Sequence, residues 1–148
     1  MARVFQHDAE GGVVIYEDGR EVGRADARGA EALIASLPEL PPPVPTSVSL
    51  SDFLWAATMA GVLTQAEALA SARTGDIPAS LEAAVLAGAT EAEQFEVRLM
   101  WAAMYEAERS SPFWEIVKAK TRGAINDEVL DGVFRMAGQR REMIAAQR

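Results

Sequence analysis

The sequence predicts an α+β protein that is mainly α. We expect a small N-terminal antiparallel β-meander with one short helix, then a proline-rich linker, and then a C-terminal all-helical domain of five to six helices. Short apolar runs separated by glycine turns fill the first part, five of the seven prolines lie within residues 38–45, and alanine-rich segments with helix-start signals fill the rest. The expected boundaries are 1–37 for a β-rich docking piece, 38–45 for the linker and 46–148 for the helical domain.

Three short strands are expected at about Arg3–Gln6, Val13–Glu17 and Glu21–Arg24. The pair Asp18-Gly19 favours a two-residue hairpin turn, because both turn positions need a positive φ. A short helix over Ala27–Leu37 can cover the sheet with four apolar residues on one side: Ala30, Leu33, Ile34 and Leu37. So few elements bury little area. We therefore interpret this segment either as a minor domain or as a piece that docks on another subunit.

The segment 38–45 is expected to be a semi-rigid, polyproline-like spacer. Proline fixes φ, lacks an N–H donor and pushes the preceding residue toward extended geometry. Recognition of this segment by an SH3-type partner is an alternative. Proline runs between two changes of composition are usually joints, which favours the linker.

Helix caps divide the first part of the C-terminal domain. Asp52–Ala60 is expected to form a helix capped by Ser51 and ended by Gly61. Thr64 with Glu67 forms a capping-box pattern that opens a helix to about Arg73. Ser80 is expected to cap a further helix over Leu81–Ala87. Alanine is frequent in all of these segments and favours helix through its low entropic cost.

The stretch Thr90–Phe134 is expected to be the centre of the fold, with three helices joined by short turns. Thr90 and Glu93 form a second capping-box pattern, and the first helix is expected to continue to a break near Arg109-Ser110-Ser111. Its apolar stripe is predicted to contain Phe95, Val97, Leu99, Trp101, Ala102 and Met104, with Glu106 at the same spacing.

The second of these helices is capped by Ser111, carries Pro112 at its first position and is ended by Gly123. Asn126 caps the third helix. Apolar residues then recur at helical spacing at Val129, Leu130, Val133, Phe134 and Ala137. We expect the three helices to close on a core of Trp and Phe side chains, and residues 136–148 to form an arginine-bearing helical tail.

Composition excludes several classes of function. The net charge of −8 opposes binding to nucleic acid through phosphate neutralisation. The charge is uneven, since residues 109–148 hold eight basic and five acidic side chains while the earlier residues hold six basic and seventeen acidic ones. Attraction between copies could use this asymmetry, although mixed surfaces also produce it. Cysteine is absent, which excludes disulfides and thiolate metal sites. No signal peptide is expected, because residues 1–8 lack an apolar core. No membrane span is expected either, because the longest apolar run, 53–63, falls far short of the ~20 residues that a span needs.

No constellation of catalytic residues is found in the sequence. His7 is the only histidine and lacks a nucleophile or an orienting partner. Acidic groups occur at Glu91/Glu93/Glu96, Glu106/Glu108 and Asp127/Glu128/Asp131, where they are expected at helix starts or exposed faces. The glycines at 11, 12, 19 and 23 do not match a phosphate-binding loop. Trp55, Trp101 and Trp114 are expected in the core. We therefore predict no catalytic, cofactor-binding or metal-binding residue.

Several short motifs of the C-terminal part resemble a helical module of tail-associated proteins from tailed bacteriophages and gene-transfer particles. The resemblance spans about residues 44–137. It is carried by Val44-Pro45-Thr46-Ser47-Val48-Ser49, Ala60-Gly61-Val62-Leu63, Phe95 to Glu108 with Trp101, Arg109-Ser110-Ser111-Pro112, and Asn126 to Phe134. Thr74–Ala89 is an inserted helical segment relative to that pattern, and Lys118–Ala124 lacks its usual Gly-Leu step. The resemblance implies a structural or assembly component and no catalytic residue.

From these observations we expect a non-enzymatic component of a phage-like tail: a fibre, tip or adaptor subunit. Its expected partners are other tail proteins or further copies of the chain, with no nucleic acid, membrane insertion or small-molecule substrate. The expected location is the virion or phage-like particle after assembly and the bacterial cytoplasm before it. The alternative is a cytosolic or prophage-encoded adaptor or regulatory protein that binds one partner through a helical surface.

Overall fold

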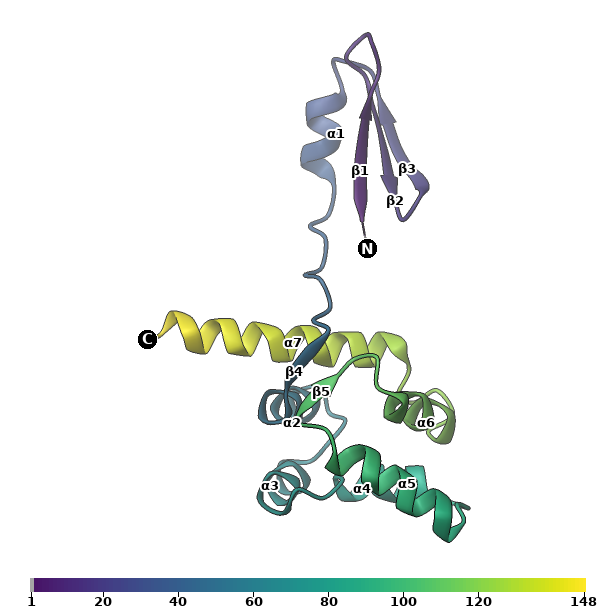
Figure 1. The fold of residues 1–148 in the computed structure, drawn as a ribbon. Helices are drawn as coiled ribbons and strands as arrows, with labels where there is room; N and C mark the ends of the chain where they lie inside the picture. Colours follow the sequence, from purple (N-terminus) through teal and green to yellow (C-terminus); the bar gives the residue numbers. More distant parts are fainter. Residues whose placement is uncertain (1) are drawn as a thin grey trace. The chain divides into compact units, whose positions relative to one another are not determined.

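The computed structural model describes residues 2–148 and divides the chain into two compact units, with the boundary between Pro43 and Val44. The described residues form a three-stranded antiparallel sheet, a two-stranded sheet and seven α-helices (Figure 1). This confirms the predicted α+β, mainly α class.

The first unit contains the predicted meander. Strands β1 (Arg3–His7), β2 (Val13–Glu17) and β3 (Arg20–Ala25) are antiparallel and lie in the order β1-β2-β3. Asp18 and Gly19 have φ values of 50° and 79°, as the hairpin turn requires. The helix α1 (Ala30–Ser36) starts three residues later than predicted, because Asp26 holds the preceding turn by accepting hydrogen bonds from the backbone N–H groups of Arg28 and Gly29.

Only one face of this sheet is covered by α1. The side chain of Leu33 lies 3.4 Å from the place where a Cβ on Gly23 would be, so the glycine allows the helix to approach β3. Ile15, which pairs with Gly23 across the sheet, is fully buried. Val4, Val14 and Tyr16 lie on the opposite face, where α1 does not reach, and Val4 is 50% exposed.

The second unit contains six helices, within the predicted range. They are α2 (Leu50–Met59), α3 (Gln65–Thr74), α4 (Ala79–Leu86), α5 (Glu91–Ala102), α6 (Pro112–Lys120) and α7 (Asp127–Ala146). The predicted caps Thr64, Thr90, Ser111 and Asn126 all accept a backbone N–H from the first turn of their helices. The segment 136–148 is continuous with α7 as far as Ala146.

Two predicted caps are wrong. Ser49, rather than Ser51, caps α2, because the chain leaves the preceding strand at Ser49 and its Oγ accepts the N–H of Asp52. Ser80 lies inside the first turn of α4, which follows Pro78 and has no side-chain cap of its own. The backbone N–H of Ser80 instead donates to Glu67 of α3 over 2.8 Å, so one carboxylate serves the starts of two helices.

The description of this unit as all-helical is also wrong. Strands β4 (Ser47–Ser49) and β5 (Glu106–Glu108) form a short antiparallel sheet in which the buried residues Val48 and Ala107 are partners. The helix α5 therefore ends at Ala102 and does not continue through Glu106. Alanine and glutamate favour helix in this segment, but pairing with residues almost sixty positions earlier in the chain overrides that local preference.

The predicted apolar stripe of α5 is only partly correct. Val97 and Trp101 are 5% and 3% exposed, whereas Phe95 and Leu99 are 65% and 55% exposed. Residues two positions apart on a helix point about 200° apart, so Phe95 and Val97 cannot both face one core. The helix buries the face with Trp101 and leaves the face with Phe95 exposed.

The core is aromatic, as predicted. Ring centroids of Phe53 and Trp114 lie 4.9 Å apart, and those of Trp101 and Phe113 lie 5.3 Å apart. Phe134 packs edge-on against Trp114 at 6.0 Å. The indole N–H of Trp101 donates to the carbonyl of Gly75 and that of Trp114 to Glu108, so both buried tryptophans have hydrogen-bond partners.

Candidate functional site

The acidic group at the start of α7 is engaged in ion pairs. The guanidinium of Arg109 donates from Nε to Asp131 over 2.7 Å and from Nη2 to Asp127 over 2.8 Å, and Lys118 donates to Asp127 over 2.9 Å. Hydrogen bonds from Lys118 and then from Arg109 lower the pKa of the Asp127 carboxyl. These carboxylates are already neutralised by side chains of the same unit, as expected for a structural role.

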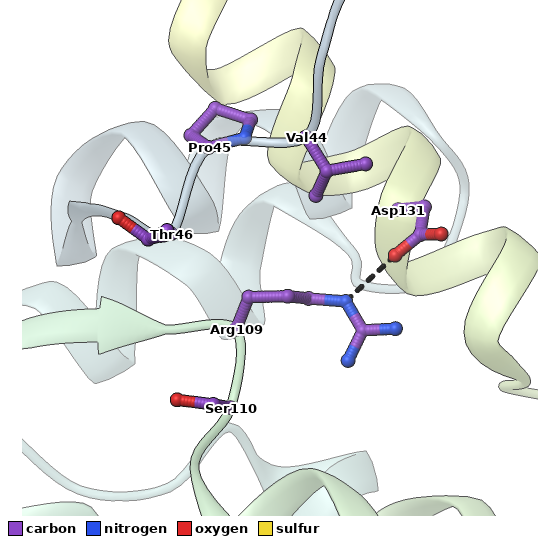
Figure 2. Close-up of a pocket in the computed structure, with 6 residues that line it drawn as sticks. All are labelled: Val44, Pro45, Thr46, Arg109, Ser110 and Asp131. Carbon is purple, nitrogen blue, oxygen red and sulfur yellow. Dashed lines mark hydrogen bonds and ion pairs between the residues drawn. The ribbon is translucent and has the colours of Figure 1, made fainter. Parts of the chain in front are cut away.

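A shallow cavity of about 460 Å³ lies beside this ion-pair group. Figure 2 shows Arg109 extended below Val44 and Pro45 toward Asp131. Thr46 and Ser110 complete the lining. Two carboxylates already accept from Nε and Nη2 of Arg109 and balance its charge, so this cavity has little net positive charge to attract an anion. The arrangement fastens the beginning of the unit to α7.

The other acidic candidates are also placed at helix starts or on the surface. Glu93 accepts the N–H of Thr90 in its capping box, and this hydrogen bond lowers the pKa of the Glu93 carboxyl. Glu106 accepts the hydroxyl of Ser47 across the short sheet. His7 is exposed at the end of β1. In the described part of the chain, no three His, Asp or Glu side chains are grouped in a way that could hold a metal ion.

The tryptophans differ in exposure. Trp101 and Trp114 are buried, as predicted. Trp55 is only partly buried and packs against the edge of the core. The guanidinium carbon of Arg140 lies 5.2 Å from the centroid of the Trp55 ring, a distance at which a cation–π interaction is favourable. Arg140 also donates to Asp52 over 2.9 Å.

A groove between α2 and α3 begins at this Arg140–Trp55 contact. Its volume is about 390 Å³, and its lining is mostly apolar. Met59 and Leu69 are 51% and 64% exposed. The main lining residues are Leu54, Trp55, Met59, Ala68, Leu69 and Arg140. An apolar groove between two helices is a surface that suits the apolar face of an amphipathic protein segment.

A second apolar surface is the outer face of α5. Phe95 and Leu99 lie one turn apart, and both are more than half exposed. Glu91 and Glu96 lie at the helical positions next to them and are also exposed. We call this set, Glu91, Phe95, Glu96 and Leu99, the α5 face.

Sequence reasoning missed both surfaces. It assigned Phe95 and Leu99 to the core, and it did not consider Met59 or Leu69. The spacing of Phe95 and Val97 contained the signal for the α5 face, since a helix with apolar residues on opposite sides must expose one set unless it is buried all round. No comparable signal marks the groove, because its walls come from helices whose packing is a tertiary feature.

Comparison of the chain with protein-family models, with curated proteins and with solved structures gives no match. Among the described residues, no helix is both long and apolar enough to cross a membrane.

Proposed function

We propose that this protein is a non-enzymatic structural or assembly component of a phage-like tail, such as a fibre, tip or adaptor subunit. It works through contacts with other tail proteins or with further copies of itself. The resemblance of residues 44–137 to tail-associated modules is the starting point of this proposal.

The observation that carries the proposal is the spatial convergence of the motifs that resemble the module. Residues 47–49 pair with residues 106–108, so the first motif lies directly beside the end of the Trp-bearing segment. The backbone N–H of Arg109 donates to the carbonyl of Thr46 over 2.9 Å. The side chain of Arg109 then binds Asp127 and Asp131 in the last motif. Motifs that are far apart in sequence therefore form one structural unit, which supports their interpretation as a module.

The exposed apolar surfaces support an action through protein contacts. The helical unit has the groove between α2 and α3 and the α5 face, and the first unit has one uncovered sheet face and an edge strand, β1. Edge strands and apolar grooves are the features by which protein segments are bound. In this proposal the sheet unit docks on one tail protein and the helical unit offers a second contact surface.

The test is made in a strain that carries the gene in its own genome and releases tailed particles. An epitope-tagged full-length chain is compared with a tagged chain that lacks residues 1–43, and purified particles are analysed by mass spectrometry and electron microscopy. We expect the full-length chain to be incorporated or to be required for tail formation, and the shortened chain to fail. Two results together would contradict the proposal: normal tails from a strain without the gene, and absence of the tagged full-length chain from the particles of the strain that makes it.

The alternative, an adaptor or regulatory protein that binds one partner, is favoured by the groove between α2 and α3. Leu69→Glu places a charge in this groove at a position that is 64% exposed, so folding is retained. An adaptor would lose its partner in a pull-down from the producing cells, whereas Arg73→Glu, on the same helix and outside the lining, would keep it. A partner captured in this way that is not a tail protein favours the adaptor.

A further inference from the structure

The last turns of α7 extend beyond the packed part of the helical unit (Figure 1). The buried residues of this helix end with Ala137, and every residue from Arg141 to Arg148 is exposed. These turns have little packing of their own, so a surface that covered their apolar side chains would stabilise them.

The exposed end of α7 keeps an apolar stripe. Ile144 follows Ala137 by seven residues, so it lies on the same side of the helix as the residues that face the core. Met143 and Ile144 are 54% and 41% exposed. Arg141 lies one turn before Ile144 on that side, and Arg148 follows two residues after the last residue of the helix, Ala146. We call this set, Arg141, Met143, Ile144 and Arg148, the α7 end.

The α5 face has the complementary pattern. It combines two large apolar side chains, Phe95 and Leu99, with two glutamates one turn away on the same side, Glu91 and Glu96. None of Glu91, Glu96, Arg141 and Arg148 forms an ion pair with another described residue. Arg98, three residues after Phe95, is already paired with Glu82 of α4 at 3.6 Å, so the unpaired charge of the α5 face is that of its two glutamates. Each surface therefore has apolar area to cover and unpaired charge, with opposite signs.

The two surfaces belong to different parts of the helical unit. The helix α5 packs against α4 and α6, whereas α7 packs against α2 and β4 (Figure 1). Along the chain, the charge of the unit is divided between an acidic and a basic segment, which contain α5 and α7 respectively. Residues 44–108 contain nine acidic and two basic side chains, and residues 109–148 contain eight basic and five acidic ones. A contact that brings these two parts together between copies lowers the electrostatic energy of both.

We propose that the α7 end of one copy docks on the α5 face of a second copy. The contact joins two different surfaces, so a pair of copies keeps one unused α5 face, on the first copy, and one unused α7 end, on the second. Repetition of the contact gives a ring where the rotation between copies closes and an open array where it does not. The area is small and the charges lie at its rim, so the association is weak and sensitive to salt.

The test uses the full chain and sedimentation velocity over a range of protein concentration at low ionic strength. We expect the average mass of the wild type to rise with concentration and to fall again on addition of salt. Two variants each remove one side of the contact, Arg141→Glu/Arg148→Glu on the α7 end and Glu91→Arg/Glu96→Arg on the α5 face. Each variant alone is expected to stay monomeric, because its altered surface now meets a surface of like charge.

The decisive sample is the mixture of the two variants. The acidic α7 end of the first variant fits the basic α5 face of the second, and the remaining two surfaces keep their original signs, so association returns in the mixture. Arg28→Glu/Arg122→Glu is the control for the first variant and Glu10→Arg/Glu39→Arg for the second. These residues are exposed and lie outside both surfaces, so the controls change net charge equally and still associate.

A wild type that is monomeric at every concentration would overturn the inference. So would association that survives both variants, or a mixture that does not recover it. Circular dichroism of each variant confirms that its helices are intact. The inference does not depend on the proposed function. If the chain associates in this way but has no part in tail formation, the contact between copies is correct and the proposed tail function is wrong.

Discussion

Phe134 and Phe95 are both phenylalanines on helices, and their environments are opposite. Phe134 is fully buried between Phe53 and Trp114, whereas Phe95 is 65% exposed on α5. Phe134→Ala leaves a cavity in the aromatic core and is expected to lower the free energy of unfolding by about 3–5 kcal/mol. Phe95→Ala removes little buried area and is expected to change it by less than about 0.5 kcal/mol. Urea denaturation followed by tryptophan fluorescence measures the free energy of unfolding of both variants. Similar losses in the two variants would contradict the placement of Phe95 on an exposed face of α5.

Arg109 is the residue that connects the motifs of the helical unit. Its side chain is 21% exposed and binds two carboxylates, so Arg109→Ala is expected to cost about 1–2 kcal/mol, more than an exposed ion pair contributes. Arg109→Lys recovers part of this loss, because one ammonium cannot form the forked contact. Arg122→Ala, at an exposed position, is the control in the same urea experiment. Equal stability of the Arg109→Ala and Arg122→Ala variants would show that the ion pairs contribute nothing.

At the scale of elements, Glu67 connects α3 and α4. Hydrogen bonds from the backbone of Thr64 and then from Ser80 lower the pKa of its carboxyl from 4.5 to about 2. The folded-state pKa lies below the unfolded one, so the stabilisation by the carboxylate is complete above pH 4.5 and is lost as the pH falls toward 2. The free energy of unfolding of wild type should exceed that of Glu67→Gln near neutral pH, and the difference should shrink through this window.

The control for this prediction is Glu96→Gln, which changes an exposed glutamate outside any capping box. Its difference from wild type is expected to be small at every pH. An NMR titration of Glu67 provides a direct second measurement. A midpoint for Glu67 near 4.5 would mean that the carboxylate does not accept these hydrogen bonds in solution.

Elements defined by local chemistry were predictable from the sequence. The capping boxes of Thr64 and Thr90, Pro112 at the first helical position and the Asp18-Gly19 turn all depend on neighbours within a few residues. β5 was not predictable, because Glu106-Ala107-Glu108 has no strand preference of its own and is extended only through pairing with β4. The cap of α2 was misplaced for the same reason, since Ser49 becomes the cap when β4 ends there.

At the scale of the whole molecule, the order of the β-rich and helical parts could be predicted from composition, but the candidate binding surfaces could not. The proline segment and the change from β-rich to alanine-rich sequence mark two parts, and the contact pattern divides the chain within the proline segment. The groove between α2 and α3 depends on Arg140, which is 88 residues from its partner Asp52. No spacing rule connects positions so far apart.

The proposed division of the molecule requires a helical unit that is stable through its own aromatic core. The most direct measurement is urea denaturation of residues 44–148 alone, followed by the fluorescence of Trp55, Trp101 and Trp114, which all lie in this unit. The aromatic core is complete within these residues, so we predict one cooperative transition at the midpoint that the same probe gives for the full chain. A gradual change of fluorescence, or a midpoint well below that of the full chain, would contradict the account.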